Sequence, residues 1–210
     1  PIMMDAMPLI VRGLGMTFLL CLAVIPLGLA GGLFVALIAR TKTKWLHLTI
    51  ICFIDFFRAV PPLVLLIFIY SGLPFAGIEI SPFSAVCLGF FLNNSAYYAE
   101  IYRSGIESIG SGQMEAARST GLSSLQSMFH IILPQATRNV LPDLLSNTIE
   151  VVKLTSIASV VAFQELLYSA DMARSLTYNS SPIVLAASIY LIILWPAVRL
   201  LSRLEHRIGQ

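Results

Sequence analysis

The chain has 210 residues, of which 57% are hydrophobic and only 11% are charged, against about 25% charged residues in typical soluble domains. A soluble protein of this length needs more charge to cover its surface, so the composition predicts one integral membrane domain over residues 1–210. The net charge of +2 is too small, and the basic residues too dispersed, for a nucleic-acid-binding protein.

The first apolar run covers about residues 14–39, and a bilayer span takes about 20 such residues. It is too long for a cleavable signal peptide, and no small-residue cleavage site follows it. The chain begins at Pro1 without an initiator methionine, so we expect residues upstream of it. The connection that follows the run, residues 40–44, is strongly positive, which is typical of a short cytoplasmic loop.

The second apolar run covers about residues 46–72 and has Pro61 and Pro62 in its middle. The residue before a proline disfavours helix, so we expect an irregularity there. The part before the prolines is predicted to be a tilted interfacial lead-in, and the part after them the core of the span. Asp55 and Arg58, three residues apart, are predicted to pair at the junction.

The third run, about residues 83–102, has Asn93, Asn94 and Ser95 near its middle. Polar groups inside a span either line a pathway or hydrogen-bond a neighbouring helix, and both interpretations stay open for these residues. Near the end of the run, Glu100 and Arg103 are predicted to form an ion pair three residues apart.

A polar loop over about residues 104–130 comes next. Residues 111–121 are predicted to form one short helix, with Ser111 as its N-cap and Gly121 as the terminating residue. Ser123 or Ser124 is expected to cap the helix that follows. The small residues of the loop would let a second backbone approach closely, so the alternatives are an ordinary surface helix and a contact with a protein partner.

The fourth run covers about residues 131–152. Polar residues recur along it at offsets that keep them on one helical face: Asn139, Asp143, Asn147, Glu150 and Lys153. Such a stripe is costly in lipid, so it should face the bundle interior or water. It either lines a pathway or holds helices together, with Glu150 simply paired to Lys153. Thr155 and Ser156 either bind a carboxylate or cap a helix near 158–169.

The fifth run covers about residues 183–201, and arginines follow through its end: Arg199, Arg203 and Arg207. Placing this tail and the 40–44 connection in the cytoplasm requires an odd number of spans. The 71–82 connection agrees, because it has no positive residue. The predicted fold is therefore an all-α membrane bundle of five transmembrane helices, with its N-terminus outside and the 104–130 loop in the cytoplasm.

That loop carries a spaced pattern, Glu-Ala-Ala-x-x-x-Gly-(nine residues)-Ile-x-Leu-Pro, which resembles the signature of the membrane subunits of ABC importers. With Leu122 beside the glycine, the residues that the resemblance assigns to coupling with an ATPase are Glu115, Ala116, Ala117, Gly121, Leu122, Ile131, Leu133 and Pro134. The stretches 58–74, 96–106 and 153–160 resemble polar amino-acid permeases. Leu65 and Leu154 depart from that family, which commonly has polar residues there.

The resemblance implies a multi-pass subunit of the bacterial inner membrane with a cytoplasmic ABC ATPase dimer, a second permease subunit (identical or paralogous) and a periplasmic solute-binding protein as partners. It implies no cofactor in this chain, with ATP and magnesium on the ATPase. The expected solute is a polar amino acid or a derivative, with a basic amino acid or an opine-like compound favoured. The predicted pathway residues are Asn93, Asn94, Asn147, Glu150, Lys153, Thr155 and Ser156.

No catalytic or metal site is predicted. The chain has no phosphate-binding loop, and its three histidines lack the H-E-x-x-H spacing of a zinc site. The three cysteines lie in apolar runs and are interpreted as inert. The alternative to an importer subunit is a secondary carrier or channel that works without an ATPase, although five spans without an internal repeat are few for a carrier.

Overall fold

The computed structural model describes residues 2–208, so Pro1, where the sequence begins, lies outside the described part of the chain. Over these residues all regular secondary structure is helical, and no strands are present. The elements are α1 (Ile2–Ile38), α2 (Lys44–Ala59), α3 (Pro62–Gly72), η1 (Leu73–Ala76), α4 (Pro82–Glu107), α5 (Ser111–Ser119), α6 (Ser124–Ser127), η2 (Met128–Ile132), α7 (Leu133–Leu154), η3 (Thr155–Val161), α8 (Leu166–Thr177) and α9 (Ser181–Ile208).

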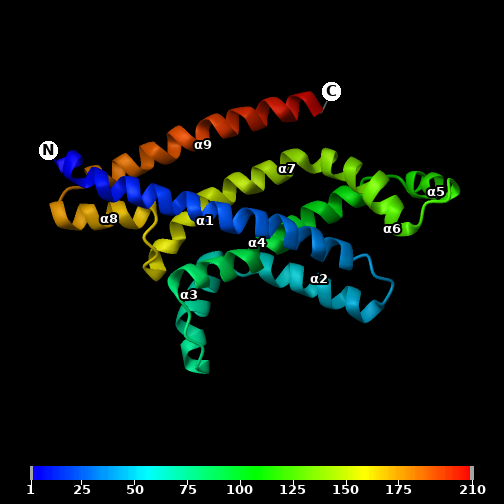
Figure 1. Ribbon diagram of the computed structural model, residues 1–210, viewed down its shortest axis with the longest axis horizontal. Helices are drawn as coiled ribbons and strands as arrows, with labels where there is room; N and C mark the ends of the chain where they lie inside the picture. Colours follow the sequence, from blue (N-terminus) through cyan, green and yellow to red (C-terminus); the bar gives the residue numbers. More distant parts are fainter. Residues whose placement is uncertain (1, 209–210) are drawn as a thin grey trace.

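Helices α1, α4 and α7 run along the long axis of the molecule, and α1 and α4 make the most extensive contact (Figure 1). Helices α5 and α6 lie at the same end as the connection between α1 and α2, whereas α8 and the N-terminus lie at the opposite end (Figure 1). The basic 40–44 connection and the polar 104–130 loop therefore share one end, as the predicted topology requires. The orientation of that end in a membrane stays a prediction.

Glycines allow the close approach of α1 to α4. A Cβ atom on Gly32 would lie 2.4 Å from the Cβ of Tyr98 and 2.9 Å from the backbone nitrogen of Ala99. A Cβ on Gly31 would lie 2.5 Å from the Oγ of Ser95. Small residues of this kind are enriched where membrane helices meet, because backbone packing replaces the hydrophobic effect there. The result is that α4 is the innermost helix of the described bundle.

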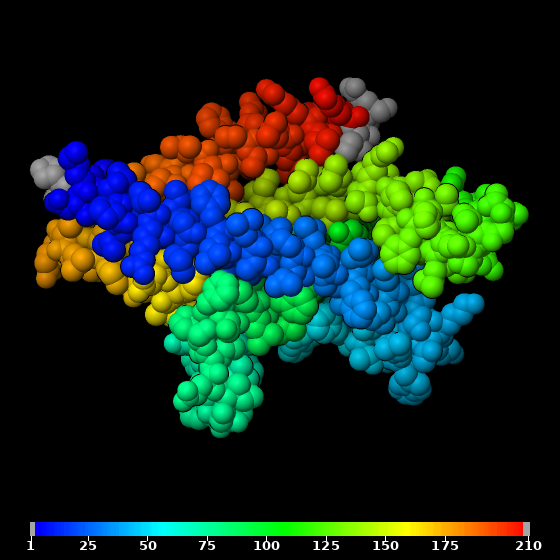
Figure 2. All heavy atoms as spheres, in the orientation of Figure 1, coloured from blue at the N-terminus to red at the C-terminus, as the bar shows by residue number. Residues whose placement is uncertain are grey.

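The irregularity predicted at the prolines of the second apolar run, residues 46–72, is confirmed. Helix α2 ends at Ala59 and α3 begins at Pro62, with a bend of 99° between them. Val60 and Pro61 are extended, with ψ of 125° and 130°, and Pro62 takes the first turn of α3, where its missing N–H costs nothing. Helix α3 consequently projects away from the bundle (Figures 1 and 2).

The bend also changes the partner of Arg58. The predicted pair with Asp55 is wrong, because the guanidinium lies against α4, 4.0 Å from the Glu100 carboxylate and 5.7 Å from the centre of the Tyr97 ring. The predicted Glu100–Arg103 pair is confirmed, with 2.7 Å between its nitrogen and oxygen atoms.

Three helical stretches of the described chain are long and apolar enough to cross a bilayer: Met3–Ile38, Ser124–Val161 and Ser181–Arg207. The bent pair of α2 and α3 is a fourth if it counts as one span. Helix α4 has the length, at 26 residues, but polar residues interrupt its apolar sequence. Because α4 packs against α1, α2, α3 and α7, its side chains face protein and do not need the apolarity of a lipid-facing helix.

The predicted helix over residues 158–169 is wrong. Helix α7 passes into the 3₁₀ turns of η3, which end at Ala162 with a φ of 61°. Helix α8 then begins at Leu166, where the Glu165 carboxylate accepts hydrogen bonds from the backbone nitrogens of residues 167 and 168 at 2.8 and 2.7 Å. A carboxylate at a helix N-terminus meets both the free N–H groups and the positive end of the helix dipole.

Candidate functional site

Helix α5 forms from the predicted short segment of the polar loop, with one difference at its start. Gly110 occupies the N-cap position without a side-chain hydrogen bond, so the prediction that Ser111 caps the helix is wrong. The predicted ending is confirmed, since Gly121 follows the C-cap Thr120 and has a φ of +90°. A residue with a side chain is strained in that left-handed conformation, whereas glycine is not.

One face of α5 is anchored to the bundle and the other is free. Ala117 is buried, and Met114 packs against a cluster built from Ile106 of α4 and Met128 of η2. Glu115, Ala116 and Gly121 are exposed, and no atom lies within 4 Å of the place where a Cβ of Gly121 would be. The small exposed residues therefore sit on a support that holds them at one end of the molecule (Figure 1).

The rest of the motif shapes that support. Ser123 caps α6 in a capping box with Gln126, which settles the choice between Ser123 and Ser124. Pro134 has no N–H, and its ring would clash with the carbonyl four residues earlier, so the preceding helix widens into the π-turn η2. Ile131 and Leu133 pack against the same cluster as Met114, whereas Leu122 is half-buried.

Two exposed apolar residues at this end of the molecule were not predicted from the sequence. Leu125 is 71% exposed on α6, and Phe129 is 49% exposed on η2. Leu125 stands alone among polar residues, in Ser-Ser-Leu-Gln-Ser, and that isolation was the available signal. Phe129 lies next to the apolar run that follows it, so nothing in the sequence indicated that its side chain is exposed. Together with the small residues, they give this end a mixed surface of the kind that protein contacts use.

Most of the polar stripe of α7 lies on the outer surface of the described chain, whereas Asn147 is half-buried and its Nδ2 is buried without a hydrogen-bond partner among the described residues. Asp143 is exposed, and the side chain of Asn139 donates to the Oγ of Ser108 at 3.2 Å. Glu150 and Lys153 form an ion pair while 57% and 48% of their side-chain surfaces stay exposed. The pairing interpretation of these two residues is correct, and the pair remains accessible to a ligand or a second chain.

The polar residues of α4 lie in helix contacts. Asn93 donates from its side-chain nitrogen to the Phe57 carbonyl at 2.9 Å, which ties α4 to the end of α2. Asn94 and Ser95 are buried against the glycines of α1. The structure favours a helix contact for Asn93, whereas Asn94 Nδ2 and Ser95 Oγ are buried without a hydrogen-bond partner among the described residues, and the pathway role of Asn94 stays a prediction.

A cavity of about 490 Å³ opens between α7 and α9 beside the stripe. Lys153 and Ser156 line it, together with Tyr190 and Trp195 of α9. Thr155 is fully buried, and its hydroxyl donates to the Val152 carbonyl at 2.6 Å, so Thr155 is not free to bind a solute. The hydroxyl of Ser156 donates to the Lys153 carbonyl at 2.9 Å. Thr155 is the C-cap residue of α7, and neither residue is the N-cap of the helix that follows.

Comparison with known proteins gives consistent results. A family model described as "binding-protein-dependent transport system inner membrane component" matches residues 28–210. The probable amino-acid ABC transporter permease protein YckA of Bacillus subtilis is 38% identical over 187 residues, 89% of this chain and 83% of its own. The glutamine transport system permease protein GlnP of Escherichia coli K12 is 36% identical over 210 residues, 96% of this chain and 94% of its own.

Solved structures show the same fold. The crystal structure of an amino acid ABC transporter with histidines contains a chain with a TM-score of 0.88 and 38% identity, which covers 98% of this chain and 96% of that one. The inward-facing MetNI methionine ABC transporter contains one with a TM-score of 0.80, which covers 98% of this chain and 99% of that one. The latter is only 19% identical, so it supports the fold alone.

Proposed function

The chain belongs to the family of binding-protein-dependent transport system inner membrane components, and we propose that it carries a basic amino acid or an amino-acid derivative across that membrane. It is the permease subunit of an amino-acid ABC importer and not an enzyme, because relatives along most of its length are such permeases. The alternative of a carrier or channel that works without an ATPase is not favoured by this membership.

The proposed partners are an ATPase dimer, which binds ATP and magnesium, a second permease subunit and a solute-binding protein outside the cell. The observation that carries the coupling proposal is the split character of α5. Met114 and Ala117 fix the helix to the bundle, while Glu115, Ala116 and Gly121 stay exposed. A rigidly mounted helix with a small-residue surface can receive a close contact and pass a displacement to α4 and α7.

The substitution Gly121→Asp tests this role. We expect the variant to insert into the membrane and to lose ATP-driven uptake, since its charged side chain occupies the contact surface and the backbone at φ +90° favours glycine. Gly110→Asp is the matched control, because its backbone is not left-handed, its Cβ position is open and aspartate is a favoured N-cap. Normal uptake by the Gly121→Asp protein would show the coupling assignment to be wrong.

The Glu150–Lys153 pair supports an amino-acid solute. A zwitterion has one group for each member of the pair, and both members are exposed, with Lys153 lining the α7–α9 cavity. Charges in a membrane-spanning helix are costly and usually serve a pathway.

Glu150→Gln tests this second assignment by uptake measurements against a panel of amino acids in the reconstituted importer. We expect a changed affinity or selectivity, because the amide attracts an ammonium group less strongly. Asp171→Asn is the matched control, since Asp171 and Arg174 form an equally spaced and similarly exposed pair on α8. A change in thermal stability alone would leave Glu150 with only a structural role.

A further inference from the structure

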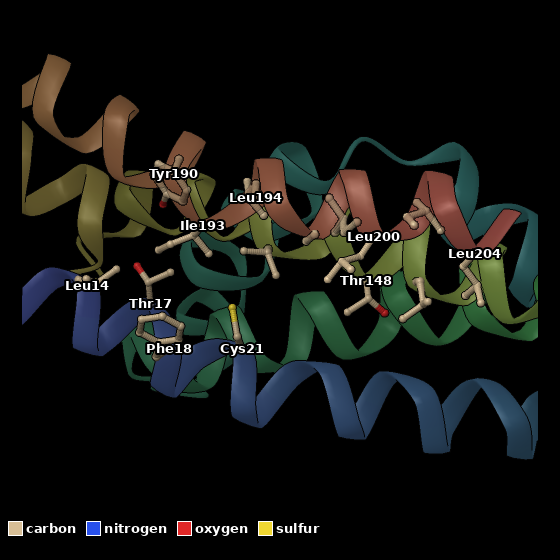
Figure 3. A pocket seen from close by; sticks show the side chains of 15 residues that line it. Leu14, Thr17, Phe18, Cys21, Thr148, Tyr190, Ile193, Leu194, Leu200 and Leu204 are labelled. Atoms are coloured by element: carbon tan, nitrogen blue, oxygen red, sulfur yellow. The ribbon is translucent and has the colours of Figure 1, made fainter. Parts of the chain in front are cut away.

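A long apolar groove of about 570 Å³ lies between α1, α7 and α9 (Figure 3). Phe18 and Cys21 line it from α1, Leu145 and Thr148 from α7, and Leu194 and Leu204 from α9. It adjoins the α7–α9 cavity beside Lys153 and shares Ile149, Tyr190 and Leu194 with it, while its lining on α1 and at the end of α9 lies outside that cavity.

The polar side chains that line the groove are satisfied within the protein. The Thr17 hydroxyl oxygen accepts from the Leu166 backbone nitrogen at 3.0 Å, and the Thr148 hydroxyl donates to the Leu144 carbonyl at 2.7 Å. The Tyr190 hydroxyl donates to the Glu165 carboxylate at 3.2 Å. An occupant therefore meets carbon surface, apart from the soft thiol of Cys21. A zwitterionic solute would lose its hydration there without gaining partners, so the groove suits a hydrocarbon.

The length of the groove suits an acyl chain. The groove follows α9 from Tyr190 to Leu204, about 21 Å at the helical rise of 1.5 Å per residue. That exceeds the roughly 15 Å depth of the hydrocarbon in one leaflet. The groove therefore offers an acyl chain a continuous apolar surface along α9.

One end of the groove is cationic. A recess of about 410 Å³ at the end of α9 is lined by Arg203, His206 and Arg207, and it shares Leu200 and Leu204 with the groove. The neighbouring Glu205 only partly offsets these charges. From the proposed function we take one element, that α9 ends at the cytoplasmic face.

We propose that this groove binds one anionic phospholipid of the cytoplasmic leaflet, with an acyl chain between α1, α7 and α9 and its phosphate group at Arg203 and Arg207. Basic residues that border an apolar groove at this face are placed to attract negatively charged head groups. The lipid would complete the contact of the C-terminal half of α9 with the rest of the bundle.

The test is lipid retention by the complete importer, reconstituted in nanodiscs of equal parts phosphatidylglycerol and phosphatidylcholine and examined by native mass spectrometry. We expect about one retained phosphatidylglycerol per permease chain. Ala197→Trp, which fills the groove from α9, should abolish retention. Ile192→Trp is the matched control, because Ile192 is 70% exposed on the same helix and does not line the groove.

The combined change Arg203→Gln and Arg207→Gln affects exposed positions and leaves the groove intact. It should reduce the preference for phosphatidylglycerol on the order of tenfold. The proposal is overturned if the native importer retains no lipid or shows no preference between the two. It is also overturned if Ala197→Trp retains the lipid, or if the double arginine variant keeps the full preference. Should Ala197→Trp fail to assemble, the arginine variant decides. The measurement needs neither ATP nor solute, so its outcome is independent of transport.

Discussion

At the residue scale, Glu165 is the most constrained charged group in the described chain. It is fully buried between the fourth and fifth predicted spans and accepts hydrogen bonds from two backbone nitrogens and from the Tyr190 hydroxyl. Burial outweighs these hydrogen bonds and raises the pKa of its carboxyl to about 7. The carboxylate thus joins the start of α8 to α9 in an environment that disfavours its charge.

This shift predicts a pH-dependent stability. In the unfolded chain the pKa is near 4.5, so as the pH rises the unfolded state releases the proton first. The stability that Glu165 contributes is full below about pH 4.5 and is lost as the pH rises through 7. Thermal unfolding of the detergent-solubilised importer across this range measures the effect, and Glu165→Gln should flatten the slope. If the stability of Glu165→Gln depends on pH as steeply as that of the native protein, a group other than Glu165 causes the dependence.

Local sequence signals predicted those residues whose role depends only on their neighbours in the chain. The left-handed Gly121 and the capping Ser123 are of this kind. The predictions that Ser111 caps α5 and that Asp55 pairs with Arg58 were wrong because other residues take these places. Gly110 is the N-cap of α5, and Glu100 of α4 pairs with Arg58. The functional roles of Glu115 and Glu150 stay predictions.

At the element scale, the contact between α1 and α4 decides how the bundle holds together. It depends on backbone proximity and not on large side chains, which makes it sensitive to a single added methyl group. The sequence showed the glycines, but nothing in it indicated that the polar middle of α4 was the surface they meet. The 99° bend between α2 and α3 was not predictable either, because two prolines predict a break in the helix but not its angle.

Gly32→Ala should therefore destabilise the protein by about 1–3 kcal/mol, because its Cβ meets backbone atoms of α4 that cannot move independently. Gly15→Ala on the same helix is the control, with no atom within 4 Å of the added Cβ. We expect a melting temperature several degrees lower for the first variant and unchanged or slightly raised for the second. Equal melting temperatures would mean that the two helices can separate at little cost.

At the scale of the whole molecule, the arrangement of ends predicts the topology. In a background without the native cysteines, Glu79→Cys and Lys42→Cys place thiols at two exposed connections. An impermeant maleimide applied to intact cells should label the first variant and should label the second only after lysis, because Lys42 belongs to the positive connection. Labelling of Lys42→Cys in intact cells would reverse the proposed orientation.

The overall architecture was largely predictable because membrane composition, charge bias and one spaced motif act along the chain and need no tertiary detail. The surface that the polar stripe of α7 occupies was not predictable. A helical face can be computed from spacing, but whether that face points into its own bundle or outward depends on how α4 and α9 pack around α7.

The outward position of the Glu150–Lys153 pair has a consequence for the life of the protein in the cell. In the chain by itself this charged pair is exposed on a membrane-spanning helix. Charges that face lipid are costly, so we expect copies without the proposed second subunit to be less stable in the membrane and shorter-lived than assembled copies. The abundance of the importer would then follow whichever subunit is produced least.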